Sequence, residues 1–114
     1  MKVIVAYWVY PHECGDTLDE RPKSIERITT SVADLKEWLC KAHARELEHT
    51  RFKFATSLYA LCPDHKYYDP EVDLDAVIED GFEWLYSKLC NDELGICFCK
   101  IGNYFYGFQV RNLH

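Results

Sequence analysis

The chain has 114 residues, of which 48% are hydrophobic and 15% aromatic, and its formal net charge is -6. This size and composition are typical of one folded domain with its own core, so we predict a single domain over residues 1–114. The negative charge and the lack of a basic patch argue against direct binding to nucleic acid. No apolar run approaches the roughly 20 residues that a membrane span needs. We therefore expect no membrane partner and a cytoplasmic location.

The first ten residues form an apolar run rich in β-branched and aromatic side chains. They lack the small-residue cleavage site of a signal peptide, and their composition predicts a buried strand. Without a secretory signal, we expect the six cysteines to be reduced thiols. Residues 11–30 are polar and predict a loop. For residues 25–30, a short edge strand and an approach to the next helix both stay open.

A first helix is predicted to begin after Ser31, whose spacing to Asp34 resembles a capping box, and to end near Leu47. His43 lies on its apolar side, where a hydrogen-bonded core histidine is the expected role. Cys40, and Cys90 in the second helix, are expected to be small buried residues. The apolar positions of the first helix recur at helical spacing: Val32, Leu35, Leu39, Ala42 and His43.

Residues 51–62 alternate in a way that predicts a strand. The next stretch, residues 63–93, holds ten acidic residues and two basic ones, a local charge of -8. Within it we predict a second helix that begins near Asp69, Pro70 and Glu71, because Pro and acidic residues favour a first helical turn. Its apolar side would be formed by Leu74, Ile78, Gly81, Phe82, Leu85 and Leu89.

Acidic residues gather on the opposite side of this predicted helix. A rotation of 100° per residue places four carboxylates there, with Trp84 on the flank beside them. An acidic face with an aromatic edge could bind a basic protein, although exposed helix faces are usually charged. The predicted partner-binding residues are Asp73, Glu79, Asp80, Glu83 and Trp84.

The end of the chain predicts a β-hairpin around Gly102 and Asn103. Pairing across this two-residue loop sets Ile101 opposite Tyr104, with one largely apolar face packed on the helices. The same pairing places Cys97 and Cys99 on one face, where a core role is favoured over a redox role. The hairpin's other face could support self-association.

The predicted element order is β-α-β-α-β-β, which indicates an α+β fold with two helices on one face of a mixed sheet of about four strands. If the first two strands run parallel, their carboxyl ends meet at one edge of the sheet. The loops there carry His12, Cys14, Cys62 and His65, which together would make a Cys₂His₂ set for zinc. We expect no cofactor, with this zinc site as the alternative.

Two function classes follow. The first is a small acidic interaction or inhibitor protein that uses the acidic helix face against a basic protein, for example one that binds nucleic acid. Inhibitors of the phage and immunity type are similar only in size and charge. The second is a small zinc-stabilised or metal-dependent domain. No catalytic motif is present, so the sequence names no enzyme.

Overall fold

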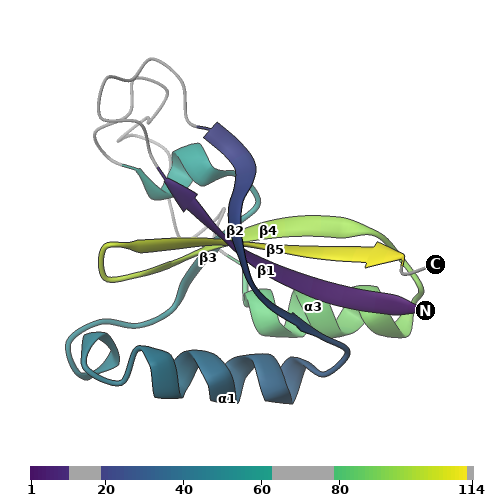
Figure 1. The fold of residues 1–114 in the computed structure, drawn as a ribbon, viewed down its shortest axis with the longest axis horizontal. Helices are drawn as coiled ribbons and strands as arrows, with labels where there is room; N and C mark the ends of the chain where they lie inside the picture. The colour runs from purple at the N-terminus through teal and green to yellow at the C-terminus, as the bar shows by residue number, and fades with distance from the viewer. Residues whose placement is uncertain (11–18, 63–78, 113–114) are drawn as a thin grey trace.

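A computed structural model of the protein describes residues 1–10, 19–62 and 79–112. Two α-helices and two short 3-10 helices accompany the strands in this part of the chain (Figure 1). In chain order the elements are β1 (Lys2–Tyr10), β2 (Asp19–Thr29), α1 (Val32–Ala42), η1 (Glu46–Glu48), β3 (Lys53–Ala55), η2 (Leu58–Leu61), α3 (Gly81–Cys90), β4 (Gly95–Ile101) and β5 (Tyr104–Asn112).

The five strands form one sheet in the order β2-β1-β5-β4-β3, and every neighbouring pair is antiparallel. The predicted α+β class is therefore confirmed, but the predicted mixed sheet of about four strands is wrong. Two strands joined through a helix are expected to run parallel only when they are neighbours in the sheet. Here β5 and β4 separate β1 from β3, so β1 and β3 run in opposite directions.

The sheet has a different apolar cluster on each face. On one face, Ile4 and Ala6 of β1 pack with Leu35 and Leu39 of α1 and with Leu85 of α3. Figure 1 shows both helices on this side of the sheet, as predicted. On the other face, residues of β1 pack with η2 through a second cluster. That cluster consists of Val3, Val5, Tyr7, Val9, Ala55, Leu58, Leu61, Cys62 and Phe98.

The C-terminal hairpin has the predicted register. Ile101 pairs with Tyr104, Cys99 with Tyr106 and Cys97 with Phe108. Gly102 in the turn has φ +59°, a conformation that glycine adopts without steric cost. The two thiols lie on the helix-covered face and are fully buried, which confirms their expected core role.

The open question about residues 25–30 is answered by β2, an edge strand that ends at Thr29. Its pairing with β1 shifts between Ala6 and Tyr7, so the strand contains a bulge there. Ile28 and Ile25 pair with Val5 and Tyr7 on the face away from the helices, and both isoleucines are exposed. The edge-strand alternative is therefore confirmed for residues 25–29, and the prediction of a loop is wrong for residues 19–24.

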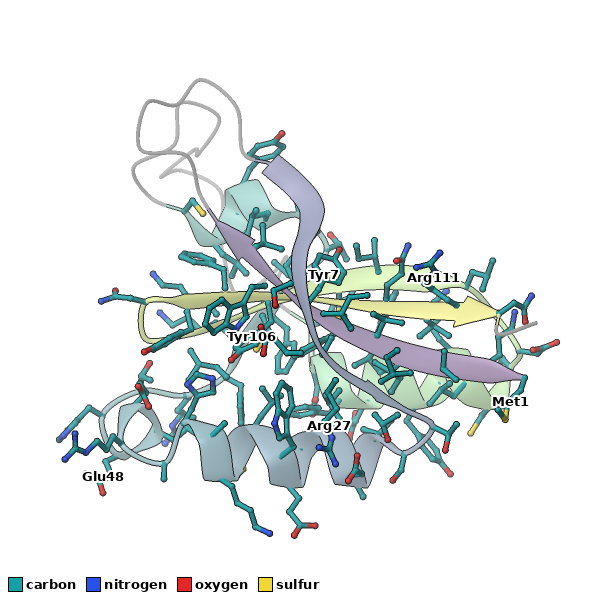
Figure 2. The ribbon with its side chains drawn as sticks, in the orientation of Figure 1. Met1, Tyr7, Arg27, Glu48, Tyr106 and Arg111 are labelled. Atoms are coloured by element: carbon teal, nitrogen blue, oxygen red, sulfur yellow. The ribbon has the colours of Figure 1, made fainter. Side chains whose placement is uncertain are left out.

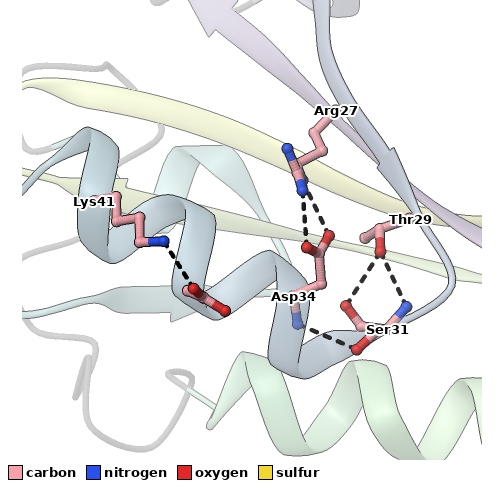
Figure 3. Close-up of polar contacts among 6 residues, drawn as sticks. Arg27, Thr29, Ser31, Asp34 and Lys41 are labelled. Atoms are coloured by element: carbon pink, nitrogen blue, oxygen red, sulfur yellow. Dashed lines mark hydrogen bonds and ion pairs between the residues drawn. The ribbon is translucent and has the colours of Figure 1, made fainter.

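The start of α1 is fixed by side chains from two elements (Figure 3). The hydroxyl of Ser31 accepts a hydrogen bond from the backbone N–H of Asp34 at 3.1 Å, as the predicted cap requires. The reciprocal contact is made differently, because Thr29 Oγ1 accepts from the Ser31 N–H at 3.1 Å. The Asp34 carboxylate instead accepts two hydrogen bonds from Arg27 of β2, at 2.8 and 3.0 Å. This bidentate pair joins the edge strand to the helix.

Several predicted boundaries differ from the structure. The helix α1 ends at Ala42 rather than near Leu47. The predicted strand over residues 51–62 is limited to β3, because the chain then forms the 3-10 helix η2, which packs on the other face of the sheet. Cys40 and Cys90 are exposed, since neither thiol lies on the side of its helix that faces the sheet. No helix in the described part of the chain is long and apolar enough to cross a membrane.

The sheet needs a glycine where β5 passes beneath Tyr7. A Cβ built at Gly107 would lie 2.3 Å from Tyr7 Cζ, so only glycine leaves room for this ring. Tyr7 and Tyr106 belong to the clusters on opposite faces of the sheet, and Figure 2 shows both side chains. Each face of the sheet thus has a buried tyrosine in its core cluster.

Candidate partner-binding groove

Three of the predicted acidic residues lie at the N-terminal end of α3. Glu79 and Asp80 precede the helix, Glu83 lies in its first turn, and all three are exposed. Because α3 begins at Gly81, the expectation that these residues share one continuous helix face is wrong. The predicted start near Asp69, Pro70 and Glu71, together with Asp73, lies outside the described residues.

Asp80 has a structural role as the N-cap of α3. Its carboxylate accepts a hydrogen bond from the backbone N–H of Glu83 at 3.4 Å. Acidic side chains at a helix N-terminus also interact favourably with the helix dipole. The spacing from Asp80 to Glu83 is that of a capping box, a pattern in the sequence that marks this helix start. Helix capping therefore accounts for Asp80, while Glu79 makes no such contact among the described residues.

A cluster of three phenylalanines holds this end of α3 against the sheet. The Phe82 ring packs edge-on against Phe52 and Phe54, with ring centroids 5.1 and 4.9 Å apart. Phe54 also lies directly on Gly81, where an added Cβ would come within 1.9 Å of Phe54 Cδ1. The glycine thus lets the helix backbone approach β3 closely, and Phe82 is held in one orientation.

An open groove runs between α1 and α3 and consists of two hollows that meet at Lys36, Phe82 and Glu83. We call it the α1–α3 groove. The first hollow, of about 950 Å³, is also lined by Cys40, Leu47, Thr50, Arg51, Phe52, Phe54, Glu79 and Asp80. The second, of about 920 Å³, is also lined by Thr30, Ser31, Val32, Ala33, Tyr86, Leu89 and Cys90.

The groove combines an apolar floor with charged margins. In the first hollow, the Phe54 ring is buried and the rings of Phe52 and Phe82 are partly buried. Beside the second hollow, Tyr86 is 63% exposed. Glu79, Asp80 and Glu83 contribute three carboxylates, against one ammonium from Lys36 and one guanidinium from Arg51. The groove's lining residues therefore carry a net negative charge beside exposed aromatic surface.

Trp84 lies away from this groove. Its indole is half-buried and packs on Gly95, where an added Cβ would come within 2.6 Å of Trp84 Cη2. The ammonium of Lys88 lies 5.3 Å from the centroid of the indole ring. The expected solvent-facing aromatic edge at Trp84 is not found. Phe82 and Tyr86 are the aromatic residues of α3 that line the groove with the carboxylates. Tyr86 was not predicted, because it does not lie on the apolar side of this helix.

The predicted zinc ligands are only partly within the described residues. Cys62 is buried at the end of η2, in the same cluster as Val9 near the end of β1. His12, Cys14 and His65 lie outside the described residues, so the zinc site stays a prediction. Within the described residues, no group of three or more His, Cys, Asp or Glu side chains is arranged to hold a metal ion.

A second polar cluster lies between the end of α1 and β5. His43 Nε2 forms a hydrogen bond with the Tyr106 hydroxyl, and His43 Nδ1 lies 3.7 Å from a carboxylate oxygen of Glu46. His43 is 5% exposed, as expected for a core histidine. Burial raises the pKa of Tyr106, so its hydroxyl keeps its proton and remains a donor. This buried cluster links the end of α1 to β5 and so stabilises the fold.

The buried thiols have no reactive character. Removal from water raises the pKa of Cys97 to about 12, and that of Cys99 well above its usual range. A thiol with a raised pKa is a poor nucleophile and a poor metal ligand, because both roles need the thiolate. Neither cysteine therefore supports a redox or catalytic site.

The chain matches no protein-family model, and comparison with curated proteins and with solved structures finds no match either.

Proposed function

We propose that the protein is a small interaction or inhibitor protein that binds a basic partner protein through the α1–α3 groove. The observation that supports this most directly is the position of Glu79, Asp80 and Glu83, three exposed carboxylates that line an open groove with an aromatic floor. Charge alone would give only a weak, salt-sensitive contact. An apolar groove beside it supplies the desolvated surface on which affinity depends.

The two parts of the groove have separate roles in this proposal. The carboxylates speed the approach of a positively charged surface and orient it. The apolar parts of the two hollows then accept side chains of the partner, and Tyr86 is an exposed aromatic residue of the kind that often contributes most to an interface. A partner that normally binds nucleic acid fits this description, because spaced carboxylates can occupy a surface shaped for phosphates.

Reversal of two charges tests the proposal. Glu79→Lys with Glu83→Lys changes the groove while leaving the helix cap at Asp80 intact. The control is Glu37→Lys with Glu48→Lys, an equal charge change at exposed positions outside the groove. Immobilised variants would be exposed to a cell extract at low and high salt, and each captured protein would be purified and titrated directly.

The proposal predicts that at least one basic protein binds the wild type and the control variant but not the groove variant, with affinity that falls as salt rises. Equal binding of the same purified proteins to all three would show that these carboxylates do not form the interface.

A further inference from the structure

Lys36 lies where the two hollows of the α1–α3 groove meet. Its ammonium is 5.6 Å from the centroid of the Phe82 ring, a distance typical of a cation–π contact. The Phe82 ring is held by edge-on contacts with Phe52 and Phe54, so the face toward Lys36 is in place before any partner arrives. Glu83 also lines both hollows at the point where they meet. An aromatic face beside a carboxylate is a site for a cation, and here a cation of the chain itself occupies it.

Lys36 differs from the neighbouring lysines in how it is held. Lys41, on the same helix, donates a hydrogen bond to Glu37 at 2.8 Å, and Lys88 donates to Glu93 at 2.8 Å. Lys36 forms no ion pair within the part of the chain that the structure describes. Its side chain is exposed, and contacts of this kind at exposed sites are weak. The ammonium can therefore be displaced from the ring.

We infer that Lys36 is an internal competitor, which occupies on Phe82 the position taken by an arginine or lysine of the partner. This inference rests on the function proposed above and identifies what the groove recognises. Arginine suits the position better than lysine, because its planar group can stack on Phe82 while donating hydrogen bonds to a carboxylate such as Glu83.

The shape of the groove indicates how that arginine is presented. A hollow lies on each side of Phe82, and each has apolar lining: Phe52 and Leu47 beside the charged residues in the first, and Val32 and Leu89 in the second. An amphipathic helix laid along α1 would present an arginine with an apolar side chain one turn before and one turn after it. The partner is thus a helical segment with arginine at the centre of an apolar stripe.

A pair of synthetic helical peptides tests this inference. Both have the same composition and charge, but one carries its arginine within a leucine stripe and the other carries it on the opposite face. Their affinities would be measured by fluorescence anisotropy for wild type, Lys36→Met and Lys41→Met. Lys36→Met keeps an unbranched side chain while removing the charge, and Lys41→Met removes the same charge from the same helix outside the groove.

For the peptide with inward arginine, Lys36→Met should bind about three- to fivefold more tightly than wild type, as expected from release of one exposed cation–π contact. Lys41→Met should change this affinity less than about twofold, because its charge is screened by solvent. The advantage of Lys36→Met should vanish for the peptide with outward arginine.

Equal affinities for Lys36→Met and Lys41→Met, or a gain that is the same for both peptides, would overturn the inference. If those results came with loss of binding in the Glu79→Lys, Glu83→Lys variant, the proposed function would stand and only the competitor role of Lys36 would fall. If neither peptide bound any variant, the inference of an arginine-bearing helical segment would be overturned, whereas the proposed function would be decided by capture of basic proteins with the Glu79→Lys, Glu83→Lys variant.

Discussion

The Nε2 atom of His43 and the hydroxyl oxygen of Tyr106 are hydrogen-bonded although the two residues are 63 positions apart in the chain. The bond ties the C-terminal end of α1 to the middle strand of the sheet. Trp38 packs edge-on against the same tyrosine, with ring centroids 6.0 Å apart. One wall of the α1–α3 groove is therefore anchored to the core through Tyr106.

The variant Tyr106→Phe should reduce the free energy of unfolding by about 1–3 kcal/mol, because it leaves a buried nitrogen of His43 without its hydrogen-bond partner. Urea denaturation measures the change. The control Tyr104→Phe removes a hydroxyl from the neighbouring exposed tyrosine and should change stability by less than about 0.5 kcal/mol. Equal losses in both variants would contradict a specific role for the His43–Tyr106 bond.

The variant Gly81→Ala should destabilise the protein by about 1–3 kcal/mol, even though alanine favours a helix. The added methyl group would lie 1.9 Å from Phe54 Cδ1, so the phenylalanine cluster must shift. Thermal unfolding checks this, with Ser87→Ala as a control at an exposed position of the same helix. A Gly81→Ala protein as stable as the control would show that β3 does not pack against the start of α3 in this way.

The buried thiol of Cys97 should make the protein less stable in alkali. Burial raises its pKa in the folded protein from 9.0 to about 12, whereas in the unfolded chain it ionises near 9.0. The stability that depends on this thiol is present below pH 9.0 and is lost as pH rises toward about 12. Denaturation at a series of alkaline pH values should show a shallower loss for Cys97→Ala than for wild type. Parallel curves would contradict the buried position.

Acid should break the contact between β2 and α1. The Arg27 guanidinium, by hydrogen bonding, holds the pKa of the Asp34 carboxyl below its usual value of 3.8. The contribution of this carboxylate is therefore present above pH 3.8 and is lost as pH falls through the lower folded-state pKa. The stability difference between wild type and Asp34→Asn, measured by denaturation, should shrink over that acidic range. A difference that stays constant with pH would contradict the ion pair.

The parts of the fold that were predicted correctly depend on contacts close in sequence. The turn at Gly102 and Asn103 fixes the register of β4 and β5, and Ser31 fixes the start of α1. The arrangement of β1 and β3 depends instead on which strands lie between them, and no local pattern shows that β5 pairs with β1. The first part of β2, residues 19–24, was missed because it carries Pro22 and many charged residues, as a loop does.

Three of the five predicted partner-binding residues line the α1–α3 groove, whereas Trp84 lies away from it and Asp73 lies outside the described residues. Glu79, Asp80 and Glu83 are exposed and close together, as the sequence indicated. The partner residues across the groove come from α1, and helical periodicity in one segment says nothing about which other segment it faces. Lys36 could therefore be found only once α1 and α3 were placed side by side.

Binding of a basic helical segment in the α1–α3 groove can be observed residue by residue in a nuclear magnetic resonance titration. Isotope-labelled protein would be titrated with the peptide that carries arginine within its leucine stripe. We expect the largest shifts at groove residues such as Lys36, Phe82, Glu83 and Tyr86, and no change at Ile25 and Ile28 on the other face of the sheet. The largest shifts at Ile25 and Ile28, or no saturable shifts at the groove residues, would contradict it.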